Sequence, residues 1–146
     1  MEYNLIQVVS DDDWKAYHAI RRAGLFEGQQ YDENHPDDRL ETNVPLLLKC
    51  DNHPVGTVRL DMREGNIAIV RLMAIKHEAQ RHGHGQYMLM LIEEFARAEG
   101  VNKLLLNAAP EAEGFYMKLG FSPEVWDENE LVGIAKNCMQ MSKVIN

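Results

Sequence analysis

The stretch Gln80-Arg81-His82-Gly83-His84-Gly85 decides how this chain is interpreted, because of the two segments that flank it. Before it lies Ile67–Ile75, a nearly all-apolar run that predicts a central strand covered on both faces. After it, Gln86–Glu99 carries apolar residues at helical spacing. The first turn of a helix has unpaired N–H groups, and glycine lets the main chain approach an oxygen-rich ligand closely. The stretch therefore predicts an anion site at the start of a helix.

The charges around this turn favour the same interpretation. The chain as a whole is acidic, with a formal net charge of −8. An anion site therefore needs a local excess of positive charge. Lys76 and Arg81 outweigh Glu78 here, and partial positive charge can come from three histidines, His77, His82 and His84.

Other interpretations of the turn are weaker. A dinucleotide site needs a third glycine and a parallel βαβ unit, and a P-loop needs Gly-Lys-Ser/Thr. Metal binding by His82 and His84 is disfavoured, because no second cluster of ligands stands near them in the sequence. A plain tight turn without a ligand remains an alternative that the glycines alone do not remove.

The rest of the chain predicts strands and helices in an α+β order. Ser10 is expected to cap a first helix, because three aspartates follow it. Gly24–Leu40 is expected to be irregular and acidic. The other predicted elements are the strands Asn4–Val9, Val44–Cys50, Val55–Met62 and Lys103–Asn107, the helix Pro110–Leu119, and a last hairpin of Ser122–Trp126 with Asn137–Lys143. Together they predict one domain over residues 1–146, built around a mixed sheet.

Composition limits the function. With 146 residues and 45% hydrophobic residues, the chain can form a core without disulfides or a metal. The net charge of −8 argues against a nucleic-acid partner. We expect a cytoplasmic protein, because the sequence shows no long apolar span and no secretion signal, and its two cysteines, Cys50 and Cys138, stand far apart.

Four segments resemble the GNAT acyltransferases. Gln80–Gly85 matches their Gln/Arg-x-x-Gly-x-Gly/Ala signature, and Arg71–Ile75 resembles their splayed fourth strand. Gly114–Phe121 resembles their FYxKLGF segment, and Gly133–Met141 resembles the closing strand of small members. The resemblance implies the GNAT fold, with a mostly antiparallel sheet, a splayed central strand and flanking helices. It also implies acetyl-CoA as co-substrate, and no metal.

The resemblance also implies residue roles. Main-chain N–H groups from Arg81 to Gly85 would hold the pyrophosphate, and Met73 and Ile75 would pair with the pantetheine arm like an added strand. Asn107 would reach the inner arm. The full set that the resemblance assigns to the cofactor is Met73, Ala74, Ile75, Gln80, Arg81, His82, Gly83, His84, Gly85, Gln86, Asn107 and Tyr116.

Tyr116 is the expected catalytic residue. A phenol has a pKa of about 10, so Tyr116 would be protonated at neutral pH and able to donate to a leaving thiolate. The alternative is a packed aromatic residue with its hydroxyl at the surface.

The group that accepts the amine proton has no assignment from the sequence. Ile67–Ile75 contains no acid, and its only charged residue is Arg71. Asp61 and Glu27 are weak substitutes, since each is explained more simply as a solvated surface charge. We expect no covalent intermediate, because neither cysteine is expected near the reacting sulfur.

The sequence thus predicts an N-acetyltransferase that moves an acetyl group from acetyl-CoA to a primary amine by direct transfer in a ternary complex. The amine would belong to a small molecule or a peptide, and the carboxylates of Glu27–Asp38 would attract a cationic one, unless that segment is merely a hydrophilic loop. A non-catalytic module that binds acyl-CoA or a partner is the alternative function. A homodimer is possible, because an open sheet edge can pair with a second copy.

Overall fold

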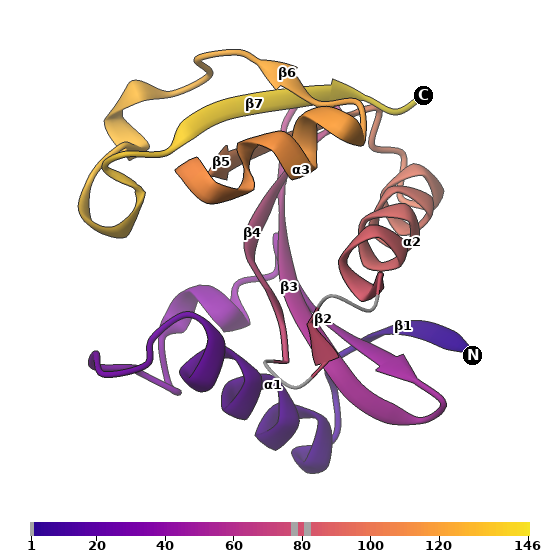
Figure 1. The fold of residues 1–146 in the computed structure, drawn as a ribbon. Coiled ribbons are helices and arrows are strands. Elements are labelled where there is room, and N and C mark those ends of the chain that lie inside the picture. Colours follow the sequence, from indigo (N-terminus) through magenta and orange to yellow (C-terminus); the bar gives the residue numbers. More distant parts are fainter. Residues whose placement is uncertain (1, 77–78, 81–82) are drawn as a thin grey trace.

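A seven-stranded sheet forms the centre of the computed structural model, which describes residues 2–76, 79–80 and 83–146 (Figure 1). The strand order is β1-β2-β3-β4-β5-β7-β6. Only the β4–β5 pair is parallel among these neighbours, which confirms the mostly antiparallel α+β arrangement. The strands are β1 (Tyr3–Gln7), β2 (Asn43–Cys50), β3 (His53–Arg63), β4 (Ile67–Ile75), β5 (Lys103–Ala108), β6 (Ser122–Pro123) and β7 (Met139–Val144).

The helices begin and end where the local chemistry favours it. The Ser10 hydroxyl accepts a hydrogen bond from the main-chain N–H of Asp13 at 3.1 Å, so α1 is capped as expected. The α-helices are α1 (Asp11–Gly24), α2 (His84–Ala98) and α3 (Glu113–Lys118). Short 3-10 helices are η1 (Pro36–Arg39), η3 (Pro110–Ala112), η4 (Glu128–Glu130) and η5 (Gly133–Ala135).

Three sequence expectations for these elements were wrong in detail. The segment Gly24–Leu40 is not wholly irregular, because Pro36 starts η1 and the His35 side chain accepts from the Asp37 N–H at 3.2 Å. The predicted helix Pro110–Leu119 is divided into η3 and α3. The predicted last hairpin is reduced to a two-residue β6 against β7, and the chain between them forms η4 and η5 instead.

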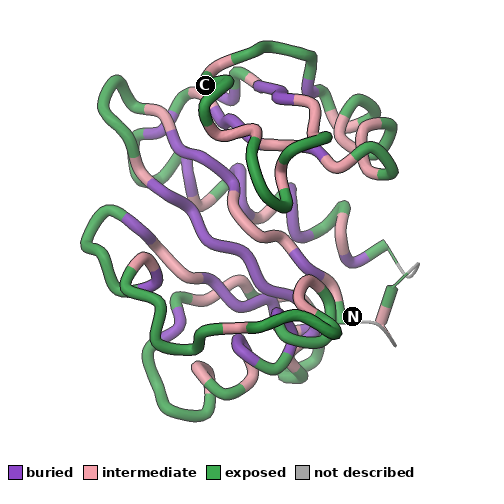
Figure 2. Tube along the Cα trace, turned by 90° about the vertical axis from the view of Figure 1, so that its left-hand side faces the viewer, coloured by how far each residue is buried: buried purple, intermediate pink, exposed green. Residues whose placement is uncertain are grey.

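The two longer helices cover opposite faces of the sheet (Figure 1). Leu46 and Leu48 on β2 belong to the core that α2 covers, whereas Leu47 between them belongs to the core under α1. This alternation follows from the two-residue period of a strand. Buried residues follow the central strands, and the connecting segments are mostly exposed (Figure 2).

A bulge in β4 opens the sheet near its middle. Arg71 lies opposite Arg59 and Ala74 opposite Thr57, so β4 has one residue more than β3 between these two pairs. Leu72, in the bulge, has φ of +52°, a conformation in which a leucine is strained. The parallel pairing of β4 with β5 ends at Val70 opposite Leu106. The last five residues of β4 therefore diverge from β5, which is the splayed strand that was expected.

The bulge also changes how β4 is buried. Ala68, Ile69 and Val70 are buried, but Arg71, Leu72 and Met73 are only partly so. The expectation of a strand covered on both faces along its whole length was therefore wrong for its second half, which forms the wall of a cavity.

Candidate active site

Two cavities meet at Tyr116. The larger one, about 710 Å³, lies where β4 and β5 diverge, and the smaller one, about 580 Å³, extends to the start of α2. Tyr116, Met73 and Glu111 line both cavities, together with Ile75, Gln80 and Ala112. The two spaces therefore form one path from the N-terminus of α2 to the far end of the sheet opening.

The smaller cavity contains the glycine turn. Gly83, His84, Gly85 and Gln86 line it where α2 begins. Gly83 has φ of +80°, which glycine adopts without strain. A Cβ on Gly85 would lie 3.4 Å from Cζ of Phe115, so a larger residue would crowd this wall. The main-chain N–H groups of a first helical turn are unpaired within the helix and suit an anion.

Parts of the expected anion site are differently placed or not described. Arg81 and His82, like His77 and Glu78, lie outside the described residues. The side chain of Gln80 donates to the main-chain carbonyl of Ile75 at 3.2 Å. His84 is only 7% exposed, and its Nδ1 lies 2.7 Å from the Tyr3 hydroxyl. The His84 ring is thus buried against β1, and its contribution of positive charge to the turn stays a prediction.

The end of β4 forms the floor of the path. Met73 and Ile75 line both cavities, and Ala74 lines the larger one. Since this part of β4 diverges from β5, its main-chain groups on that side are available to an extended ligand. The geometry thus brings Met73, Ala74 and Ile75 together with the glycine turn, as the sequence predicted.

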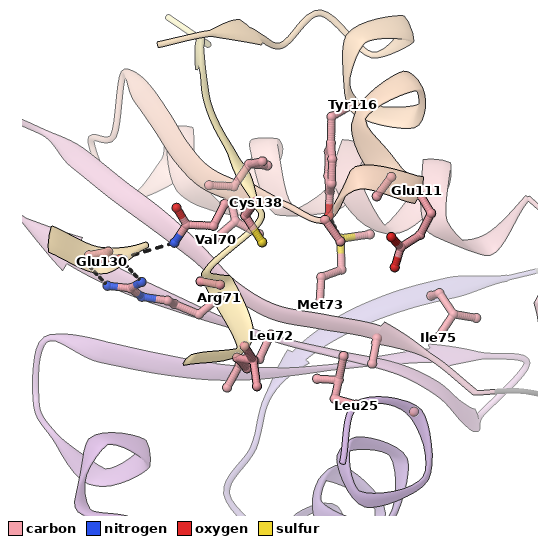
Figure 3. A pocket seen from close by; sticks show the side chains of 18 of the residues that line it. Leu25, Val70, Arg71, Leu72, Met73, Ile75, Glu111, Tyr116, Glu130 and Cys138 are labelled. Atoms are coloured by element: carbon pink, nitrogen blue, oxygen red, sulfur yellow. Dashed lines mark hydrogen bonds and ion pairs between the residues drawn. The ribbon is translucent and has the colours of Figure 1, made fainter. Parts of the chain in front are cut away.

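Tyr116 points from α3 toward β4 (Figure 3). Its hydroxyl lies 3.8 Å from the sulfur of Met73. Burial raises the pKa of the Tyr116 phenol to about 12. The alternative of a hydroxyl at the surface is therefore wrong, and the phenol keeps its proton at every pH an ordinary assay uses.

The far end of the larger cavity has a charged pair that the sequence did not indicate. Both guanidinium NH groups of Arg71 donate to the carboxylate of Glu130 on η4, one of them at 2.9 Å (Figure 3). Asn107 donates to the same carboxylate at 3.3 Å. These donors lower the pKa of Glu130. Asn107 also accepts from Gln140 at 3.0 Å, so its amide is already engaged on both sides.

Asp61 is not the solvated charge that the sequence suggested. It is 2% exposed and accepts hydrogen bonds from Arg59 and from Arg71, the latter at 3.1 Å. Both of its carboxylate oxygens are therefore engaged by guanidinium groups. Glu27 is exposed, as expected, but it does not line the larger cavity. Of the described residues, the carboxylates that line this cavity are Glu111 and Glu130.

Neither cysteine was expected near the reacting sulfur, but Cys138 lines the larger cavity together with Tyr116 (Figure 3). Burial, with Glu111 and Glu113 nearby, raises the pKa of its thiol. The thiol is therefore protonated at neutral pH, which makes it a weak nucleophile. Cys50 is buried in the core under α2, away from the cavity.

The acidic segment Glu27–Asp38 is partly neutralised within the fold. Asp38 is buried and pairs with Arg21 and Arg59, at 3.0 and 3.1 Å. Glu33 pairs with Arg22 at 2.9 Å on the surface. No residue of this segment is among those that line the larger cavity. An attraction of cationic acceptors by this segment would thus act from outside that cavity.

The described part of the chain has neither a cluster of metal ligands nor a membrane-spanning helix. Within residues 2–76, 79–80 and 83–146, no three side chains of His, Cys, Asp or Glu are grouped in a way that suits a metal ion. None of the helices described there has the length and apolar content needed to span a bilayer.

Comparison with known proteins identifies the class. The sequence model of the acetyltransferase (GNAT) family matches residues 7–121, and the chain belongs to this family. Its structure is similar to that of the ribosomal-protein-S18-alanine N-acetyltransferase from Escherichia coli, with a TM-score of 0.77 and 17% identity over 99% of this chain and 95% of that one. It is also similar to the PaiA N-acetyltransferase from Thermoplasma acidophilum, solved in complex with coenzyme A, with a TM-score of 0.70 and 17% identity over 99% of both chains.

A relative of similar length is known in Bacillus subtilis (strain 168). The uncharacterised protein YyaT is 27% identical over 122 residues, which cover 81% of this chain and 82% of YyaT. The match spans most of both chains, so the likeness concerns nearly the whole of each.

Proposed function

We propose that this protein transfers the acetyl group of acetyl-CoA directly to a primary amine, with Tyr116 as the general acid. The observation that carries the proposal is the meeting of the two cavities at Tyr116 and Met73. One cavity begins at the first turn of α2 and the other ends at Arg71 and Glu130. A donor and an acceptor entering from opposite ends would meet beside the phenol.

The donor would lie in the smaller cavity and along β4. Main-chain N–H groups of Gly83 to Gln86, with Arg81 and His82 before them, would hold the pyrophosphate. The free side of Met73–Ile75 would pair with the pantetheine arm. Asn107 lines the larger cavity beyond this point, where its main chain can contribute although its side-chain amide is engaged with Glu130 and Gln140.

The reaction needs one proton acceptor and one proton donor. The neutral amine attacks the thioester carbon, the C–S bond breaks, and Tyr116 protonates the departing thiolate. The nitrogen loses its remaining extra proton as the amide forms, and this proton restores the Tyr116 phenol. An alkylammonium with a pKa of about 10.4 is almost entirely protonated at neutral pH, so its proton must be removed first. Glu111 is placed for this role, because its carboxylate lines both cavities beside Tyr116 and has no hydrogen bond or ion pair among the described residues.

Replacing the phenol tests this function. In Tyr116→Phe we expect kcat to fall by about 100-fold, the scale of general acid catalysis, with little change in coenzyme A affinity. Free thiol released from acetyl-CoA, in the presence of a panel of amines, measures the rate, and calorimetry measures the affinity. Tyr87→Phe is the matched control, since Tyr87 stacks on Tyr3 and lines neither of the two cavities.

Two outcomes would contradict the proposal. Coenzyme A that binds without thiol release for any amine would favour the non-catalytic binding module. A Tyr116→Phe protein that keeps the full rate would remove the phenol from the chemistry while leaving acetyl transfer in place.

A further inference from the structure

The Arg71–Glu130 ion pair marks the far end of the larger cavity. Glu130 and Arg71 lie at one end of the view in Figure 3, Glu111 and Ile75 lie toward the other, and Tyr116 lies between them. An acceptor in this end of the larger cavity would lie beside the Arg71–Glu130 pair.

The charges at this end are already balanced without a ligand. Arg71 donates through Nε to Asp61 and through both NH groups to Glu130. Asp61 also binds Arg59, which binds Asp38, which binds Arg21. Three guanidinium groups thus alternate with three carboxylates, so each of these three guanidinium groups already has a carboxylate partner.

The Glu130 carboxylate is fixed in place by the loop that carries it. Gln140 accepts from the main-chain N–H groups of Trp126 and Asp127, both at 2.9 Å, and donates to the Asp127 carbonyl at 2.7 Å. The Trp126 indole donates to the Leu106 carbonyl at 3.1 Å. These bonds anchor the chain just before η4, the short helix that carries Glu130.

Apolar side chains make up much of the remaining wall. Leu25 follows α1, Leu72 comes from the β4 bulge, and Ile134 comes from η5. Ile134 is 67% exposed, which leaves a large apolar side chain at the cavity's edge. Such surfaces suit the hydrocarbon part of a ligand.

We infer that this end of the cavity selects amines with an apolar body and excludes amines that carry a carboxylate beside the amino group. A guest ammonium meets the anionic Glu130, whereas a guest carboxylate meets the same anion beside an Arg71 guanidinium that Glu130 and Asp61 already hold. Repulsion between like charges is a general way in which a site excludes the wrong ligand. The inference rests on the proposed function for the location of the acceptor.

Three related amines test the selection. Leucine, leucinamide and 3-methylbutylamine share an apolar body and differ in the group beside the amine. We expect kcat/KM for leucine to be at least tenfold lower than for either of the other two. In Glu130→Gln, Arg71 keeps an oxygen partner but no longer faces a negative charge. The kcat/KM for leucine, divided by that for 3-methylbutylamine, should therefore rise at least tenfold. Glu128→Gln, on the same short helix but outside the cavity, should leave the ratio unchanged.

Binding measurements separate this inference from the proposed function. Calorimetric titration of the coenzyme A complex with 3-methylbutylamine and with leucine should show at least tenfold tighter binding of the amine, whether or not acetyl transfer occurs. That preference without turnover would support the selection and contradict the acetyltransferase. The selection would be overturned if the two compounds bound equally or if neither bound. It would also be overturned if a Glu130→Gln protein with a normal melting temperature kept the native ratio of kcat/KM for leucine to kcat/KM for 3-methylbutylamine.

Discussion

The buried hydroxyl of Tyr116 sets the pH range in which the site can donate a proton. Among the described residues, the hydrogen-bond partner of its hydroxyl is the sulfur of Met73, and burial raises its pKa. A phenol donates its proton only below its pKa, so a raised pKa extends the range in which it is an acid. The Tyr116 hydroxyl is thus suited to an assay pH at which the acceptor amine has begun to lose its proton.

The pH dependence should follow from this pKa. We expect kcat/KM for a simple alkylamine to rise from pH 7 to pH 10, because the neutral fraction of the amine grows about tenfold per pH unit. No decline from Tyr116 is expected in this range, since its pKa is about 12. Initial rates of thiol release across the range measure the profile. A decline below pH 10, in protein that is still folded, would show that the acid has a much lower pKa.

Residues whose place at the site follows from local sequence were predictable, and those whose place depends on distant contacts were not. Gly83, Gly85 and Tyr116 stand in short motifs, and the structure brings them to one path. Glu130 is 59 residues away from Arg71 along the chain, in a loop without periodicity, so no pattern indicated their contact. Asp61 was mistaken for a surface charge because its partners, Arg59 and Arg71, are identified only when β3 and β4 pair.

Among the secondary-structure elements, the start of α2 is where a single substitution should most weaken binding of the acetyl-CoA donor. In Gly85→Val the new side chain would enter the smaller cavity beside Phe115, whose ring already limits the space. We expect coenzyme A affinity to fall at least tenfold, measured by calorimetry. Gly114→Val is the control, because a Cβ there meets nothing within 4 Å.

An unchanged coenzyme A affinity in Gly85→Val would contradict the proposed diphosphate site. If Gly85→Val binds coenzyme A as the native chain does, with an unchanged melting temperature, the first turn of α2 does not hold the diphosphate. Weaker binding in both variants would instead indicate a general loss of structure around α3.

Elements with strong periodicity were predicted closely. The predicted strand Ile67–Ile75 has the bounds of β4, because its apolar run follows the turn residues Gly65 and Asn66 and ends before Lys76. The chain from Glu124 to Cys138 was less predictable. Gln140 holds Trp126 and Asp127, and Arg71 holds Glu130 on η4. Both partners lie outside the segment, so local propensity alone predicted a longer hairpin.

At the scale of the whole molecule, the alternating ion pairs join α1, η1, β3, β4 and η4. Removing one buried member should leave its partners without a counter-charge. In Asp38→Ala, Arg21 and Arg59 both lose a carboxylate, and Arg21 already has two buried nitrogens without a partner among the described residues. We expect the free energy of unfolding to fall by about 3–5 kcal/mol.

Urea denaturation measures that loss. Asp37→Ala, at the neighbouring exposed carboxylate, is the control and should change the free energy of unfolding by about 0.5 kcal/mol or less. A similar small change in Asp38→Ala would mean that water or a rearranged carboxylate can replace Asp38 beside the two arginines.

The extra residue in β4 has a consequence for how such a protein can gain or lose its chemistry. Deleting Leu72 would put Met73 directly opposite Val58 and leave Ala74 opposite Thr57 and Ile75 opposite Gly56. The ladder between β3 and β4 would then be unbroken, and nothing would bend β4 away from β5. A deletion of three nucleotides could in this way convert an open catalytic sheet into a closed, inert one while most of the core stays intact.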